Sequence, residues 1–102
     1  MTAMKRLPIE PRVLGELCRR HGIRRLSLFG SVLKGTARPD SDIDLLVEFE
    51  PGATPGFLGM AEIETELSHA LGGRQVDLRT APELNKFSRD EVVRTAEVQF
   101  VA

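Results

Sequence analysis

Residues 28–47, LFGSVLKGTARPDSDIDLLV, decide the fold of this chain. An apolar run ends at Phe29, a Gly-Ser pair follows it, and a polar stretch then leads into a second apolar run. From residue 42 to residue 50 acidic and apolar side chains largely alternate, which is typical of a strand with one face on a core. The stretch therefore predicts two strands joined by a glycine turn, a short helix and a further turn through residues 38–40.

The segments on either side show the periodicities of helices and strands. Apolar residues recur at helical spacing over 10–21 and 57–71, and glycine follows both segments. Ser88 and Glu91, three positions apart, form a capping box that predicts a last helix through residue 96. Further strands are predicted at 23–29, 75–79 and 98–101. Residues 1–102 are thus expected to form one α/β (α+β) domain: a small mixed sheet, helices on one face, and the other face partly open.

Composition limits the classes of function. The 102 residues are 41% hydrophobic and 28% charged, with a net charge of −1. A general nucleic-acid binder would carry a clearly basic face and aromatic stacking residues, but Trp and Tyr are absent. No apolar run approaches the roughly 18 residues of a membrane span. Cys18 is the single cysteine, which excludes an intramolecular disulfide and a cysteine-based zinc site. We therefore expect a cytoplasmic protein that binds neither nucleic acid directly nor a membrane.

Three aspartates are candidates for the chemistry. Asp42 and Asp44 lie two positions apart on one predicted strand and so share a face, and Asp77 joins them if Val76 and Leu78 pack on the same core. Carboxylates this close repel unless a cation lies between them, and Mg²⁺ prefers oxygen ligands. Two such ions about 4 Å apart can clamp an in-line phosphoryl displacement. The alternative is a solvated strand face for the first two acids and an unremarkable single acid for the third.

The Gly-Ser pair is a candidate phosphate site. Gly30 and Ser31 stand where a strand runs into a short helix, so backbone N–H groups there favour an anion and glycine permits its close approach. The Ser31 hydroxyl adds a donor, and Lys34 and Arg38 could neutralise further triphosphate charge. The alternative is that Gly30 only ends a strand, Ser31 only caps a helix, and the two basic residues are solvated.

Taken together, these motifs resemble a known signature. Gly30-Ser31, ten residues, and then Asp42-x-Asp44 is similar to the pattern of the DNA polymerase beta-like nucleotidyltransferase superfamily, and within it to the minimal nucleotidyltransferases of bacteria and archaea (the MntA type). The resemblance covers nearly the whole chain and implies a polymerase-beta-like palm fold. One departure is visible, because members often carry basic residues just after the Gly-Ser pair, whereas Val32 and Leu33 precede Lys34 here.

The resemblance also implies roles. Asp42 and Asp44 would bind two Mg²⁺ ions, and Asp77 would bind the catalytic ion and help deprotonate the acceptor hydroxyl. We expect the nucleotide, ATP, to be held by Gly30, Ser31, Lys34, Arg38 and Ser41. Minimal members are typically encoded beside an all-helical HEPN-type toxin and act as its antitoxin by transferring AMP to a tyrosine of the toxin.

Two other functions stay open at this point. The chain could be an antitoxin that neutralises its partner by binding alone, although three clustered acids disfavour that. It could also transfer a nucleotide to a small-molecule acceptor, which the lack of a second domain disfavours. The sequence leaves open the preferred base, the number of nucleotides transferred, the acceptor residue and the stoichiometry.

Overall fold

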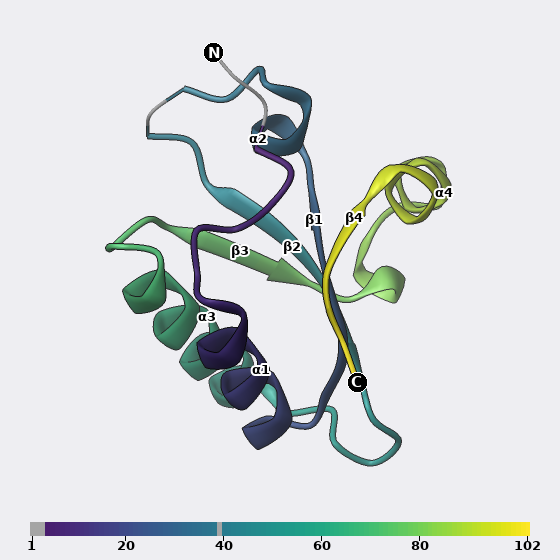
Figure 1. Cartoon of the computed structure of the whole chain (residues 1–102). Coiled ribbons are helices and arrows are strands. Elements are labelled where there is room, and N and C mark those ends of the chain that lie inside the picture. The colour runs from purple at the N-terminus through teal and green to yellow at the C-terminus, as the bar shows by residue number, and fades with distance from the viewer. Residues whose placement is uncertain (1–3, 39) are drawn as a thin grey trace.

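The computed structural model describes residues 4–38 and 40–102 and contains the predicted series of elements (Figure 1). In chain order these are α1 (Pro11–Arg20), β1 (Ile23–Phe29), α2 (Ser31–Lys34), β2 (Ile43–Phe49), α3 (Phe57–Ala70), β3 (Val76–Arg79), the 3₁₀ turn η1 (Ala81–Glu83), α4 (Lys86–Thr95) and β4 (Glu97–Val101). Pro39, in the predicted turn through 38–40, lies outside the described residues. Among the described helices none is long and apolar enough to cross a membrane.

The four strands form one mixed sheet in the order β3-β2-β1-β4. β1 is antiparallel to both β2 and β4, whereas β2 and β3 are parallel. The parallel pair requires a crossover, which α3 supplies between the two strands. The predicted mixed sheet and α/β class are confirmed.

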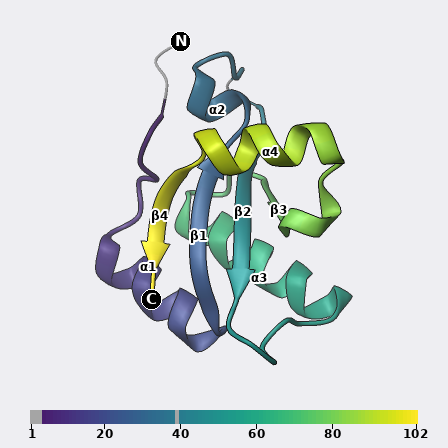
Figure 2. The same cartoon turned by 90° about the vertical axis from the view of Figure 1, so that its right-hand side faces the viewer.

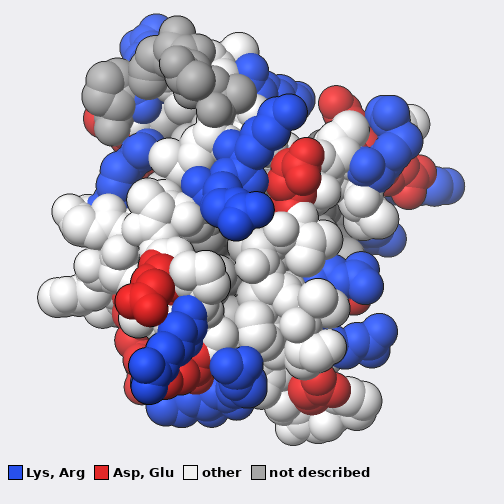
Figure 3. Space-filling view, viewed as in Figure 1, with Lys and Arg blue, Asp and Glu red and all other residues white. Residues whose placement is uncertain are grey.

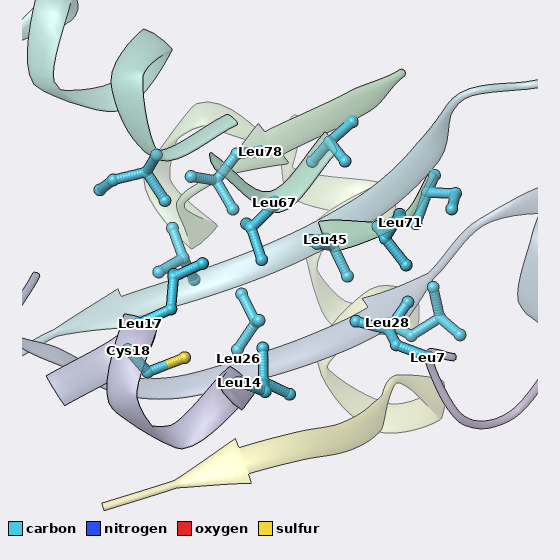
Figure 4. Packing of buried hydrophobic residues seen from close by; sticks show 14 of the residues in the cluster. Leu7, Leu14, Leu17, Cys18, Leu26, Leu28, Leu45, Leu67, Leu71 and Leu78 are labelled. Carbon is cyan, nitrogen blue, oxygen red and sulfur yellow. The ribbon is translucent and has the colours of Figure 1, made fainter. Parts of the chain in front are cut away.

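The core lies between the sheet and the helices α1 and α3. The inward residues of β2 are almost fully buried, as the alternating pattern predicted. They pack with leucines of β1 and with apolar residues of the two helices (Figure 4). The labelled members of this cluster include Leu14, Leu17, Cys18, Leu26, Leu28, Leu45, Leu67 and Leu78. Burial raises the pKa of the Cys18 thiol to about 12, which makes it an inert core residue.

Helix α4 lies on the opposite side of the sheet from α1 and α3 (Figures 1 and 2). The prediction of helices on one face holds for α1 and α3, while α4 crosses the upper part of the other face in Figure 2. No residue of α4 is buried. The face with the acids is therefore only partly covered, and α4 borders it.

The predicted start of the last helix was wrong. Helix α4 begins at Lys86, and the side chain of Asn85 caps it by accepting a hydrogen bond from the Ser88 backbone N–H (2.9 Å). Asparagine is as good an N-cap as serine, and it stands three residues earlier. A Thr-x-x-Glu pattern does operate just upstream, where the Glu83 carboxylate accepts from the backbone N–H of Thr80 (2.9 Å).

Candidate active site

Two of the three aspartates lie on one face of two neighbouring strands, and the third stands directly before one of these strands. The parallel register places Asp44 opposite Asp77, and Leu45 opposite Leu78. Both leucines are buried in the core, so both aspartates emerge on the other face. Asp42 is exposed and stands directly before β2, two positions from Asp44. The predicted common face is confirmed for Asp44 and Asp77, and Asp42 lies close enough to affect the pKa of Asp44.

The electrostatics of this face are unfavourable for a bare carboxylate. The pKa of Asp44 is raised above its ordinary value, chiefly because burial disfavours the charged form, and further because Asp77 and Asp42 are negative. Arg79 acts in the opposite direction. A site that destabilises its own negative charge is suited to a positive ligand.

The glycine turn touches this acid cluster. Phe29 pairs with Asp44 across β1 and β2, so Gly30 follows directly beside the Asp44 side chain. Gly30 has a φ of 82°, and a Cβ there would overlap Oδ2 of Asp44. Glycine is thus required twice, for its backbone conformation and for the space that the carboxylate occupies. Ser31, partly exposed, begins α2 at the same point.

The other predicted nucleotide-binding residues are placed less directly. The Nζ of Lys34 lies 3.7 Å from the Glu91 carboxylate of α4, in an exposed ion pair. Arg38 is exposed. The Ser41 hydroxyl accepts a hydrogen bond from the Arg38 backbone N–H (2.8 Å), so it fastens the loop that enters β2. In this structure Lys34 is engaged with α4 and Ser41 with its own loop.

Two arginines beside the acids were missed in the sequence. Arg79 donates from Nε to Oδ1 of Asp77 (3.1 Å), and this hydrogen bond raises the pKa of the guanidinium. Arg74 donates to the backbone oxygen of Ser41 (2.9 Å) and so holds the segment that leads to Asp42. The alternation Asp77-Leu78-Arg79 carried a signal for the first contact, since positions two apart on a strand share a face.

The three aspartates have the chemistry that Mg²⁺ prefers, but their side chains are not oriented to bind one ion together. Carboxylate oxygens are the ligands that Mg²⁺ prefers, and three of them on one face give the right donor set. Within residues 4–38 and 40–102, however, no three His, Cys, Asp or Glu side chains are close enough to hold a metal ion as they stand. Asp77 is turned to Arg79 instead. The expected convergence of the three acids is thus met in position and not in side-chain orientation.

Basic side chains form no continuous surface in the view of Figure 3. Lys and Arg lie there beside Asp and Glu, in keeping with the net charge of −1. A strip for a nucleic-acid backbone would need consecutive positive charges. The described residues on this face offer none in that view.

The profile of the Nucleotidyltransferase domain family matches residues 10–102. The chain is 41% identical over 86 residues to the protein adenylyltransferase MntA of Thermococcus cleftensis, covering 84% of this chain and 82% of that protein. A solved structure described as a minimal nucleotidyltransferase has 42% identity and a TM-score of 0.68, and the match covers 84% of this chain and 85% of that one. A toxin–antitoxin complex with AMP-PNP shares the fold, with a TM-score of 0.70 at 24% identity over 92% of this chain and 75% of that one.

Three observations indicate the same family: the fold, the Gly-Ser turn beside the acids, and the extent of these matches. The resemblance inferred from the sequence is confirmed, including the polymerase-beta-like fold. The chain is a nucleotidyltransferase, and it belongs to the Nucleotidyltransferase domain family as a minimal member of the MntA protein adenylyltransferase type.

Proposed function

We propose that this protein transfers AMP from ATP to a hydroxyl group, on a tyrosine, of an all-helical HEPN-type toxin and acts as its antitoxin. The contact that carries the proposal is that of Gly30 with Asp44, which itself lies opposite Asp77. It brings the Gly30–Ser31 turn, which we propose as the phosphate site, and two carboxylates together at one end of β1, β2 and β3. The 41% identity to a protein adenylyltransferase, and the shared fold with a toxin–antitoxin complex that contains an ATP analogue, support the choice of acceptor and nucleotide.

The proposed reaction is a single displacement at phosphorus. The acceptor oxygen attacks the α-phosphorus of ATP, the bond from that phosphorus to the bridging oxygen breaks, and pyrophosphate leaves with the electron pair. The proton of the attacking hydroxyl passes to a carboxylate oxygen of Asp77. Backbone N–H groups at Gly30 and the Ser31 hydroxyl hold the phosphates that depart.

Asp42, Asp44 and Asp77 would hold two Mg²⁺ ions. When bound, these ions would neutralise the triphosphate and polarise the phosphoryl group that is transferred. The support from this chain is the set of three acids; the pKa of Asp44 is raised by burial first, and then by the charges of Asp77 and Asp42. The exposed ion pair of Lys34 with Glu91 is weak enough to exchange for a phosphate, and Arg38 and Ser41 complete the proposed nucleotide contacts. The cytoplasmic location stays a prediction.

Intact masses of the co-expressed pair test the proposal. The chain would be produced with the HEPN-type protein encoded beside it, as the wild type and as Asp42→Asn with Asp44→Asn. We expect AMP-sized increments on the partner with the wild type and none with the double variant, and peptide mapping should place them on tyrosine. The matched control is Glu48→Gln, an acid on the same face of β2 that pairs with Arg25 (3.4 Å), and it should retain the increments.

Two results would overturn adenylylation of a protein. If the pair binds tightly and no mass is added, neutralisation by binding alone is the function. If pyrophosphate is released only with small hydroxyl compounds, the acceptor is a small molecule.

A further inference from the structure

Among the described residues, Arg79 is the basic side chain that contacts the acid cluster formed by Asp42, Asp44 and Asp77. Its contact differs in kind from those of other arginines on this side of the molecule. Arg74 donates to the backbone oxygen of Ser41, and Arg89 donates to the backbone oxygens of Ala81 and Leu84. Those two fasten one segment of the chain to another. Arg79 instead reaches back along its own strand to the Asp77 carboxylate, two positions away. Because both residues belong to β3, this contact does not hold two elements together. The pair therefore has no evident role in stabilising the fold.

The position of Arg79 limits what Asp77 can do. Residues 77 and 79 share a face of β3, and the register places them opposite Asp44 and Leu46 of β2. The guanidinium donates to Oδ1 of Asp77 at 3.1 Å, so one carboxylate oxygen of the third acid is already engaged. Like the ion that the three acids would bind, the guanidinium is positive, so the two compete for Asp77 and repel each other at short range.

The pair is weak enough to exchange. Its side chains are 45% and 33% exposed, and a single Nε contact lacks the two parallel hydrogen bonds of a strong guanidinium–carboxylate pair. Exposed pairs of this kind contribute little free energy. A divalent cation can therefore displace the guanidinium.

We propose that Arg79 is the internal counter-ion of the acid cluster: it holds Asp77 while no metal is bound, and its release sets the concentration at which a divalent cation enters. Arg79 is thus a positioning residue that acts through Asp77. The inference rests on the proposed metal-dependent transfer.

Binding of Mn²⁺ alone to the purified chain, followed by the electron paramagnetic resonance signal of the free ion, tests this inference without any turnover. We expect Arg79→Gln to bind Mn²⁺ about three- to tenfold more tightly than the wild type, because the competing charge is gone. Arg79→Lys, which keeps the charge, should stay close to the wild type. On an Asp77→Asn background, where the competition for Asp77 is gone and only the direct repulsion is left, the gain from Arg79→Gln should be smaller.

The matched control is Arg25→Gln. It removes the same charge from an exposed ion pair, because Arg25 lies 3.4 Å from Glu48. Glu48 is four positions along β2 from Asp44. We expect its Mn²⁺ affinity to change less than about twofold, because the interaction between the two sites is largely screened at that separation. Equal gains in Arg25→Gln and Arg79→Gln would show a general charge effect and overturn the proposal, as would unchanged or weaker binding by Arg79→Gln.

The same measurement separates this inference from the proposed function. If Asp42→Asn with Asp44→Asn abolishes Mn²⁺ binding while Arg79→Gln changes nothing, only the role of Arg79 fails. If the double variant binds Mn²⁺ as the wild type does, the metal site itself is elsewhere and the proposed mechanism fails. Thermal melts of each variant confirm that the compared proteins are folded; should Arg79→Gln not fold, Arg79→Met replaces it with the same expectation.

Discussion

The two faces of β2 lie in opposite environments, although their residues alternate along one strand. Ile43, Leu45 and Val47 are at most 1% exposed and belong to the core between the sheet and the helices α1 and α3. Asp44 and Glu48 point to the other face, where both remain partly accessible. Burial of apolar surface stabilises the first face, whereas the second keeps like charges together and loses stability by it. Substitutions on the two faces should therefore separate activity from stability.

The largest effect is expected at Asp44. Replacing it by Asn should lower the rate of AMP transfer by at least about 10³-fold, because metal stabilisation of the transferred group is worth several kcal/mol and each 1.36 kcal/mol is about tenfold. Single-turnover transfer to the partner is the measurement, and Glu48→Gln, four positions along the same face, should change the rate less than about threefold. Equal losses in both variants would mean that the whole face contributes charge and that the aspartate has no special role.

The opposite face should respond in stability. Leu45→Ala is expected to lower the free energy of unfolding by about 2–5 kcal/mol, since Leu45 is 0% exposed and lies within the core. Its control is the adjacent Leu46→Ala. Leu46 points to the acid face and is itself buried, at 7% exposed, but it lies outside the main core cluster, so its loss should be smaller. Urea denaturation measures both, and equal losses would show that η1 and the acid face form a second packed layer.

A substitution at Gly30 should affect both stability and activity, and Gly52 is its matched control. Both have a left-handed backbone, with φ of 82° and 79°, so alanine should strain either position by about 1 kcal/mol. A Cβ at Gly30 would overlap the Asp44 carboxylate, whereas a Cβ at Gly52 would meet no described atom within 4 Å. Gly30→Ala is therefore expected to lose about 10²-fold in transfer as well, because a displacement of about 1 Å can have that effect. A Gly52→Ala protein with an equal loss of activity would contradict this.

The sequence predicted the features that follow from periodicity. Alternation along 42–50 gave the buried face of β2, and the flanking residues Val76 and Leu78 gave the outward direction of Asp77. The glycine turn at residue 30 was also predicted, but its free space was assigned to a phosphate, whereas the Asp44 carboxylate lies there. Each of these depends on backbone geometry and burial, which a local pattern of residue types records directly.

Other features depend on choices that local patterns do not record. Helix α4 had two good N-caps three positions apart, Asn85 and Ser88, and their intrinsic preferences do not distinguish them. The prediction of helices on one face did not hold for α4 either, since a helix with no buried residue gives no apolar stripe to orient it. Alternation places Asp77 and Arg79 on one face of β3, but whether the two side chains pair depends on their rotamers and on which neighbouring charges are nearest in space.

The smallest expected effect is the change in stability caused by the Asp44 carboxyl. It tests most directly how the two faces of β2 differ. The folded-state pKa of Asp44 is raised, by burial first and by the charges of Asp77 and Asp42 next. The folded protein therefore holds this proton more tightly than the unfolded chain, and stability falls as pH rises through the interval between the ordinary pKa and the raised one. Below that interval the penalty is absent, and above it the penalty is complete.

Asp44→Asn removes the penalty, so the inactive variant should melt a few degrees above the wild type at neutral pH. The difference should shrink as the pH is lowered through that interval and vanish once the carboxyl is protonated in both states. Thermal melts from neutral pH down to about pH 3 measure this, with Glu48→Gln as the control that should show no such gain. A variant less stable than the wild type at neutral pH would mean that the Asp44 carboxylate contributes to folding. The expected gain would mean instead that the acid face lowers the free energy of unfolding. Burial of Leu45 and its neighbours on the other face would then offset that loss.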